Sequence, residues 1–199
     1  MINSKKIRLR KRGLADALDS YVWQTDPELV QLDAIPVLTA TFARYLSDYL
    51  SEIRYPSPNK YVFAIETLAG KHIGTCSYYN INETKGEVEL GIMIGNRDCW
   101  GKGYGTDAVT TLLDNIYRAT SLNRIYLKTI DSNHRAQHCF KKCGFTPCGH
   151  LTENGYNFVL MEIYHKQWED RQIEEEHSVE TKPPLQANSL SPSKEVTRG

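Results

Sequence analysis

The sequence predicts a mixed α/β (α+β) fold, with a central and mostly antiparallel sheet of about seven strands flanked by helices. Two patterns predict it. Three consecutive β-type runs between residues 61 and 95 are joined by short turns, which is typical of an antiparallel meander. A helical run over residues 104–118 then precedes a β-type run over residues 124–130, and a strand, helix, strand unit of this kind makes a parallel pair. The predicted sheet is therefore mixed.

The N-terminal part is predicted to hold one edge strand and two helices. Residues 7–12 alternate apolar and basic side chains, as in an edge strand whose lysines and arginines discourage further pairing. A helical stretch over residues 15–23 follows. Pro36 is predicted to open a second helix, which Pro56 and Pro58 end. The apolar stripe of that helix comprises Leu38, Phe42, Tyr45, Leu46, Tyr49, Leu50 and Ile53.

The rest of the domain is predicted to alternate between strands and helices. The helix over residues 104–118 has a regular apolar face, and a further helix from Asn133 ends at Gly144, a normal residue just past a helix C-terminus. The buried face of the first helix is predicted to be Ala108, Val109, Leu112, Leu113, Ile116 and Tyr117. The strands other than 124–130 are predicted over residues 61–67, 72–81, 86–95, 145–151 and 155–165, the last two around an Asn154-Gly155 turn.

Length and charge bound the class of protein. The chain has 199 residues, with 24 lysines and arginines against 24 aspartates and glutamates, so no overall basic field attracts nucleic acid. No apolar run reaches the length of a membrane span, and the first residues lack the pattern of a secretory signal, so we expect a cytoplasmic protein with no membrane partner. Residues 1–168 are predicted to form the domain, and the polar residues 169–199 a disordered tail.

A glycine-rich loop lies between the third meander strand and the next helix, with the sequence WGKGYGT over residues 100–106. Glycines allow successive backbone N–H groups to turn toward an anion, and a helix N-terminus adds the positive end of its dipole. The loop therefore predicts a phosphate or pyrophosphate site, against the alternative of a tight turn. Gly103 follows Lys102, which excludes a Walker A loop, and Thr106 stands where a dinucleotide-binding fingerprint has its third glycine.

The loop and a later helix resemble the GNAT superfamily of acetyl-CoA-dependent N-acetyltransferases. The family's loop signature is Gln or Arg, two residues, Gly, one residue, then Gly or Ala, and residues 100–105 match it except at Trp100. A second signature resembles Asn133, Ala136, Phe140 and the Gly144-Phe145 pair. Together they extend the resemblance over residues 7–166. The strand ELGIMI is most similar to the branch that includes the ribosomal-protein N-terminal alanine acetyltransferases.

The resemblance implies acetyl-CoA as cofactor and acetyl donor, bound where a parallel strand pair splays apart. It places the pyrophosphate on the loop and the pantetheine arm along the preceding strand, with Asn133 bonded to the arm. Arg135, Lys141 or Lys142 would reach the adenosine phosphates, unless this is only a solvated basic helix face. The implied loop donors are Gly101, Lys102, Gly103, Tyr104, Gly105 and Thr106, and the strand backbone is that of Ile92, Met93 and Ile94.

The implied reaction is attack of a neutral amine on a thioester, which needs a group that takes a proton from the ammonium. Glu89 is the first candidate base, because it stands at the glutamate of the family's Glu-aliphatic-Gly pattern, and Glu87 shares its sheet face by the two-residue period. Phe140 stands where many members have a proton-donating tyrosine. Tyr78, Tyr79 or Tyr156 is the candidate replacement, and each is equally a packed strand aromatic.

No metal site is predicted. The pairs His134 with His138 and Cys139 with Cys143 have helical spacing, but they face different sides of the helix and include no Cys-x-x-Cys knuckle. The leading hypothesis is direct acetyl transfer to a primary amine of a small molecule or a protein N-terminus. The alternatives are a weakly catalytic acyl-CoA-binding sensor or scaffold, which Phe140 motivates, and a protein whose glycine loop is only structural. Exposed aromatics and a central sheet are compatible with a homodimer.

Overall fold

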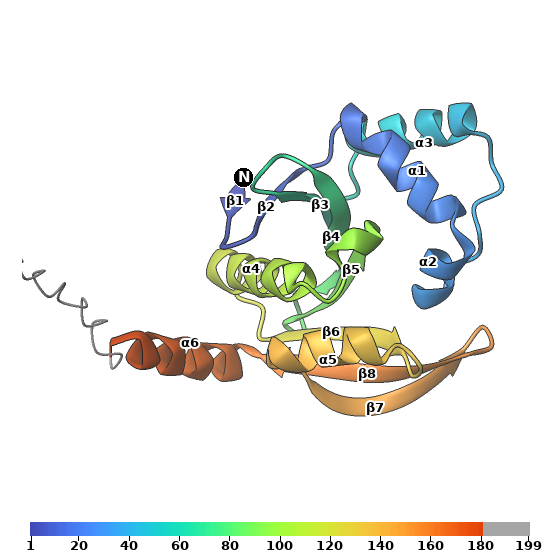
Figure 1. The fold of residues 1–199 in the computed structure, drawn as a ribbon. Helices are drawn as coiled ribbons and strands as arrows, with labels where there is room; N and C mark the ends of the chain where they lie inside the picture. The colour runs from blue at the N-terminus through green and yellow to red at the C-terminus, as the bar shows by residue number, and fades with distance from the viewer. Residues whose placement is uncertain (181–199) are drawn as a thin grey trace, which may run out of the picture.

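The structure, a computed structural model that describes residues 1–180, is built on one sheet with the strand order β1-β2-β3-β4-β5-β6-β8-β7 (Figure 1). Neighbouring strands are antiparallel except β5 and β6, which confirms the predicted mixed sheet. The strands are β1 (Ile2–Asn3), β2 (Ile7–Lys11), β3 (Lys60–Thr67), β4 (His72–Asn82), β5 (Glu87–Ile94), β6 (Arg124–Ile130), β7 (Thr146–Glu153) and β8 (Tyr156–Tyr164). The sequence did not predict β1, because a two-residue strand has no periodicity to detect.

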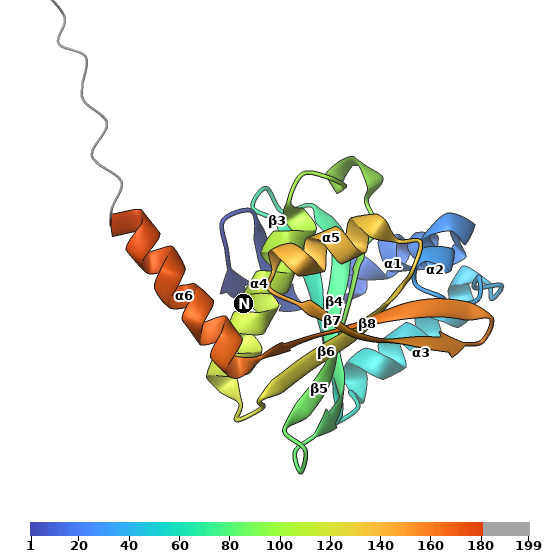
Figure 2. The same cartoon turned by 90° about the horizontal axis from the view of Figure 1, so that it is seen from below.

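Helices cover both sides of the sheet. In Figure 2, α3 lies on the other side of the central strands from α4. A 3-10 turn (Leu14–Asp16) leads into α1, and a second one (Arg97–Cys99) precedes the glycine loop. The helices are α1 (Ala17–Thr25), α2 (Pro27–Leu32), α3 (Phe42–Arg54), α4 (Tyr104–Ala119), α5 (His134–Lys142) and α6 (His165–Glu180).

Two predictions about helices were wrong. Pro36 does not open a helix: α3 begins at Phe42, where the Thr41 side chain caps it by accepting a hydrogen bond from the Arg44 amide. The predicted disordered tail is wrong over residues 169–180, which continue α6, and the remainder of that prediction lies outside the described residues. The α6 helix is held at its start by Trp168, whose buried indole packs on Tyr117.

The main hydrophobic core lies between α4 and the sheet. All six α4 residues predicted to face inward are buried, because their three- and four-residue spacing places them on one side of the helix. They pack against buried residues of β2, β4, β5, β6 and β8. A smaller cluster joins α1 to α3 through Ala17, Tyr45 and Tyr49. The first core fixes α4, and with it the glycine loop, against the end of β5.

The parallel strands β5 and β6 pair only over a short length. Their register joins Glu87 with Arg124, Val88 with Ile125 and Glu89 with Tyr126. Beyond this point β5 continues to Ile94 and β6 to Ile130 without further pairing between them. The two strands therefore splay apart, as predicted, and one backbone edge of β5 faces the gap.

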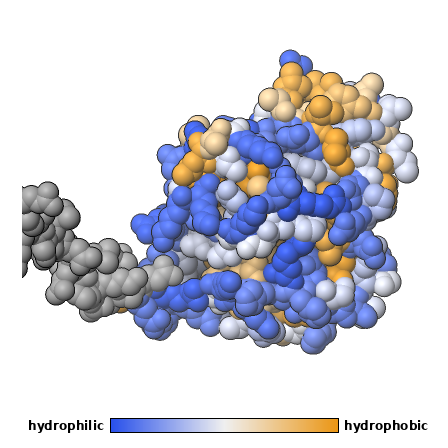
Figure 3. Space-filling view, in the orientation of Figure 1, coloured by the Kyte–Doolittle hydropathy of each residue, from blue (hydrophilic) through white to orange (hydrophobic). Residues whose placement is uncertain are grey.

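Hydrophobic side chains gather on the surface over α1 and α3, visible as orange at the upper right of Figure 3. Leu14 in the 3-10 turn before α1, and Leu18 and Val22 in α1, are each more than half exposed and follow one another at four-residue spacing. Among residues 1–180, no helix has the length and apolar character needed to cross a bilayer.

Candidate active site

Two cavities meet at the splayed strands. The smaller, of about 240 Å³, lies among the glycine loop, the first turns of α4 and α5, and the end of β5. The larger, of about 630 Å³, lies over β4 and β5 and is walled by β6, β8 and the segment after α2. Both include Ile92 and Met93 in their linings, so they join along the unpaired edge of β5. This arrangement can bring a bound donor and a bound acceptor together.

The glycine loop presents free amide donors to the smaller cavity. Gly103 is the N-cap of α4 with a φ of 83°, a left-handed conformation that favours glycine, and no side chain caps the helix. The first backbone N–H groups of a helix have no partner within it, here those of Gly103 to Thr106. Gly101, Gly103, Gly105 and Thr106 line the cavity, so these positions fit a pyrophosphate.

Two predicted loop residues do not line this cavity. The Lys102 side chain is exposed, and Tyr104 lies outside the lining and instead receives the Lys6 ammonium over its ring, 5.7 Å from the centroid. Lys6 also donates a hydrogen bond of 2.8 Å to the Lys102 carbonyl. This lysine places a positive charge beside the loop from the turn between β1 and β2, far away in the sequence, and no sequence signal linked it to the site.

Trp100, which departs from the family signature, has a defined role in the loop. Its indole N–H donates a 2.6 Å hydrogen bond to the carbonyl of Ile94, at the end of β5. The guanidinium of Arg135 lies 3.4 Å from the centroid of the indole ring, within cation–π range. Trp100 therefore joins three parts of the smaller cavity: the loop, the strand edge and the first turn of α5.

Asn133 and Phe140 lie where the two cavities join. Asn133 caps α5 by accepting a hydrogen bond from the Ala136 amide through its side-chain oxygen, and its amide group lines both cavities. Phe140 also lines both and cannot donate a proton. On the same helix, Cys139 lies 3.5 Å from the Thr106 hydroxyl and Cys143 lies 3.8 Å from that of Thr110, so these thiols pack α5 on α4.

The structure places Glu89 beneath the larger cavity and outside its lining. Its carboxylate is buried, with an exposed fraction of 7%, and accepts hydrogen bonds from the Tyr79 hydroxyl at 3.1 Å and the Asn80 side-chain amide at 2.9 Å. Tyr79 itself lines the cavity, and Gly91 leaves room for it, because a Cβ at that position would lie 3.2 Å from the tyrosine ring. An acceptor amine in the cavity therefore meets Tyr79 before Glu89.

Glu87 lies in an ion-pair network outside both linings. Its carboxylate accepts a 2.7 Å hydrogen bond from Arg124, which also binds Glu162 at 2.7 Å. This network ties β5 to β6 and β8 at the base of the parallel pair. The prediction that Glu87 shares catalytic work with Glu89 is therefore not supported by its position.

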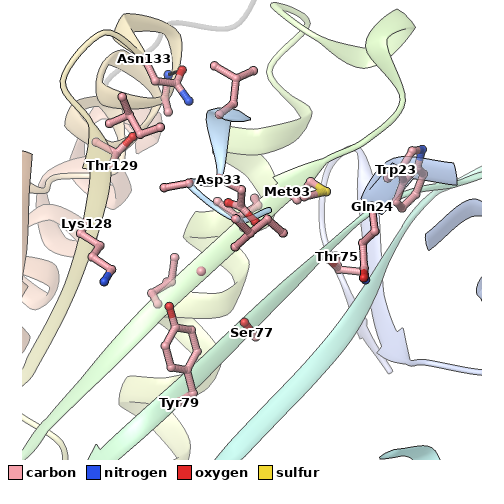
Figure 4. A pocket seen from close by; sticks show the side chains of 18 of the residues that line it. Trp23, Gln24, Asp33, Thr75, Ser77, Tyr79, Met93, Lys128, Thr129 and Asn133 are labelled. Carbon is pink, nitrogen blue, oxygen red and sulfur yellow. Dashed lines mark hydrogen bonds between the residues drawn. The ribbon is translucent and has the colours of Figure 1, made fainter. Parts of the chain in front are cut away.

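One carboxylate of the larger cavity was missed by the sequence. Asp33 follows α2 and lies in the middle of the cavity, with Lys128 and Thr129 of β6 on one side and Met93, Ser77 and Tyr79 on the other (Figure 4). Its carboxylate has no hydrogen-bond or ion-pair partner within residues 1–180. Asp33 is exposed to solvent in the open cavity, and crowding by the protein around it raises the pKa of its carboxyl to about 6.

An amide cradle for a pyrophosphate, a free strand edge leading from it and a second cavity at the far end are the features of an acyltransferase that takes its acyl group from a coenzyme A thioester. A family model described as the acetyltransferase (GNAT) domain matches residues 6–146. The chain belongs to this family and is an N-acetyltransferase by class.

Relatives and solved structures agree with this membership. An uncharacterised N-acetyltransferase, p20, from Bacillus licheniformis is 28% identical over 131 residues, which are 65% of this chain and 73% of the relative. A spermidine N(1)-acetyltransferase of Vibrio cholerae is 31% identical over 91 residues, 46% of this chain and 52% of the relative.

Among solved structures, the spermidine N-acetyltransferase from Vibrio cholerae in complex with CoA and spermine has a TM-score of 0.72 at 21% identity. The alignment covers 81% of this chain and 97% of that one. The aminoglycoside acetyltransferase AAC(6')-Ib in complex with coenzyme A has a TM-score of 0.70 at 21% identity, covering 83% and 99%. At these identities the likeness shows the fold.

Proposed function

We propose that this protein transfers the acetyl group of acetyl-CoA directly to a primary amine of a small cationic molecule. The observation that carries the proposal is that the cradle for a pyrophosphate and the larger cavity join along the unpaired edge of β5. A donor on the loop and an acceptor in the larger cavity would then react without a covalent enzyme intermediate. Acetyl-CoA supplies an activated acyl group as a thioester.

The residues that would hold the donor are those of the smaller cavity. The amides of Gly103 to Thr106 fit the pyrophosphate, and the backbone of Ile92 to Ile94 would pair with the pantetheine arm as an added strand. The Ile94 carbonyl already accepts a hydrogen bond from the Trp100 indole, so the pantetheine arm would pair with the other backbone groups of this strand edge. Arg135, stacked on Trp100, is positioned to meet the adenosine phosphates.

A small cationic acceptor fits the larger cavity better than a protein N-terminus. The cavity holds one unpartnered carboxylate, Asp33, and a row of hydroxyls from β4, those of Thr75, Ser77 and Tyr79. The curated relative from Vibrio cholerae acts on spermidine, by its name. A ribosomal-protein N-terminus, which the strand ELGIMI suggests, is the competing acceptor.

Calorimetry and product analysis test the function separately. Titration with acetyl-CoA and with ADP is expected to show tighter binding of acetyl-CoA, because the pantetheine arm adds contacts along β5. Mass spectrometry of products from a panel of spermidine, kanamycin and an alanine-starting peptide is expected to show one added acetyl group on the small polyamine or aminoglycoside. Acetylation of the peptide alone would contradict the choice of acceptor.

The alternative of a sensor or scaffold has one specific observation in its favour, the position of Phe140 at the junction of the cavities. It predicts that the protein binds acetyl-CoA and acetylates nothing on the panel, and that Phe140→Tyr creates activity. Turnover by the unmodified protein would remove this alternative, because a thiol pKa near ~8.5 makes the thiolate a tolerable leaving group without a dedicated acid.

A further inference from the structure

The junction of the two cavities carries one ionisable side chain. The residues that line both cavities are Leu32, Asp33, Ile92, Met93, Asn133, Ala136 and Phe140. Of these shared residues, Asp33 alone can carry a charge. In the proposed function a thioester held on β5 and an amine held over β4 meet at this junction, where Asp33 is the ionisable side chain shared by both linings.

The fold holds Asp33 in this place through α2. The helix is capped at its start by Asp26, which accepts from the amides of Glu28 and Leu29. At its end the Ile35 amide donates back to Val30, and the residue after Asp33 takes a left-handed φ of 53°. This turn keeps residues 32–35 in the lining of the larger cavity, with Asp33 among them.

The same helix is fastened to the loop that would bind the donor. Arg97, the first residue of the 3-10 turn after β5, donates to both carboxylate oxygens of Asp26 at 2.7 and 2.9 Å and to Glu28 at 2.7 Å. The donor loop and the segment bearing Asp33 are therefore fixed relative to each other across the junction.

Other charged groups of the cavities are engaged or distant from the junction. On the acceptor side, Arg12 pairs with Glu52 at 3.0 Å and Lys128 pairs with Glu153, while Lys60 and Tyr156 lie away from the shared lining. Burial and the charge of Glu89 raise the pKa of Tyr79 most, and the negative charge of Asp33 adds to the increase. Asp33 and Tyr79 therefore interact electrostatically. On the donor side the titratable groups are Arg135, His138, Cys139 and Lys142.

We propose that Asp33 binds the ammonium group of the acceptor at this junction and accepts a proton from it, and so is a catalytic residue of the proposed N-acetyltransferase. The inference rests on the proposed function. It assigns to Asp33 the role of base for which Glu89 was the first candidate, because the Glu89 carboxylate is bonded to the Tyr79 hydroxyl outside the cavity lining.

The Asp33 carboxylate takes one proton from the ammonium, and the freed amine nitrogen forms a bond to the acetyl carbonyl carbon. The carbon–sulfur bond then breaks, the thiolate leaves, and a second proton passes from the acetylated nitrogen to the sulfur. Asp33 returns its proton to water. The products are the N-acetyl amine, free CoA and one proton.

The raised pKa of Asp33 suits this role. An ordinary aspartate near ~3.9 is a far weaker base than an amine near ~10, and a value of about 6 narrows that gap. The carboxylate is still ionised at neutral pH and able to attract a cation. The contrasting interpretation is that Asp33 is only a polar residue of the turn after α2.

The test compares the full-length protein with Asp33→Asn, Asp33→Glu and the surface control Asp48→Asn, using spermidine as the acceptor. Asp48 lies on α3 in an exposed ion pair with Arg44, so Asp48→Asn removes one negative charge away from the cavities. We expect Asp33→Asn to lower kcat/KM by ~100-fold or more, the usual range for a lost general base, with acetyl-CoA affinity within twofold of the parent. Asp33→Glu is expected to retain part of the activity and Asp48→Asn all of it.

The pH profile separates the catalytic role from a structural one. For the parent, kcat/KM is expected to fall tenfold per unit below about pH 6 and to stay level up to the pKa of the amine. This acidic limb should be absent from the residual activity of Asp33→Asn. A variant that keeps kcat/KM within threefold of the parent, or that keeps the acidic limb, would overturn the assignment.

A binding measurement separates failure of this inference from failure of the proposed function. If the parent acetylates no amine, the proposed function fails, and spermidine is then titrated by calorimetry into the protein saturated with CoA. Binding that weakens at least tenfold in Asp33→Asn, and not in Asp48→Asn, supports Asp33 as the ammonium site. Equal binding by all variants, or none by the parent, refutes it.

Discussion

Replacing Trp100 with phenylalanine tests whether this departure from the family signature supports the donor site. The change removes the 2.6 Å hydrogen bond to the Ile94 carbonyl, which contributes about 1 kcal/mol net, and weakens the stacking of Arg135, which contributes about 0.5–1 kcal/mol. We expect the free energy of unfolding to fall by about 1–2 kcal/mol, which lowers Tm by roughly 2–8 °C in a chain of this size. Because both contacts lie in the donor cavity, acetyl-CoA should also bind about tenfold more weakly.

Trp168→Phe is the matched control. Trp168 is buried, where Trp100 is half-buried, and like Trp100 it donates its indole N–H, here to Asp114 at 2.7 Å. The Arg118 guanidinium lies 5.7 Å from its ring, and the residue lies outside both cavities. Thermal melting and calorimetry with acetyl-CoA on both variants are the assay. We expect a similar loss of Tm, with weaker acetyl-CoA binding only in Trp100→Phe. If the two variants bind acetyl-CoA equally well, Trp100 has no part in the donor site beyond stability.

Three further predictions concern the loop and the two carboxylates. Gly103→Ala forces a left-handed φ on alanine and should lower the free energy of unfolding by about 1–2 kcal/mol, measured by thermal melting. Gly149→Ala is the control, because a Cβ there makes only an ordinary contact and the backbone is not left-handed. Equal melting temperatures for the two variants would contradict backbone strain at Gly103. Glu89→Gln still accepts from Tyr79, so kcat should fall less than about tenfold; a loss above ~100-fold in steady-state kinetics would restore Glu89 as the base. The pKa of Asp33 in the folded protein lies above its unfolded value, so ionisation of this carboxyl lowers the free energy of unfolding as pH rises through about 4 to 6. In thermal melts, Asp33→Asn should therefore have the same Tm as the parent at pH 4 and a higher Tm than the parent at pH 8.

The elements from β3 to β8 were predictable because their signals are local. Short segments of sequence carry the two-residue period of the strands, the 3.6-residue period of α4 and the Asn154-Gly155 turn. The structure has each of these elements where its pattern predicts it. The segment between α1 and α3 was not predictable in this way. The α2 helix has six residues, buries Leu29 and Val30, and pairs with Arg97, 71 positions from Asp26, and no periodicity within so short a segment can reveal these contacts.

The two glutamates of β5 show the limit of a periodic argument. The period correctly places Glu87 and Glu89 on one face of the strand, but it does not say what covers that face. Tyr79 and Asn80 come from the neighbouring strand and cover Glu89, while Arg124 of β6 binds Glu87. Their contacts depend on the register of three strands.

The sequence by itself determined the family, the mixed sheet and the position of the donor loop, because glycines at fixed spacing before a helix create an anion site from backbone groups alone. Only the tertiary structure decided which side chains face the acceptor. Asp33 lies on a turn without a motif, and it reaches the cavity because the segment after α2 lines it together with residues of β5 and β6. A backbone site depends on local conformation, whereas a side-chain site between layers depends on how distant segments pack.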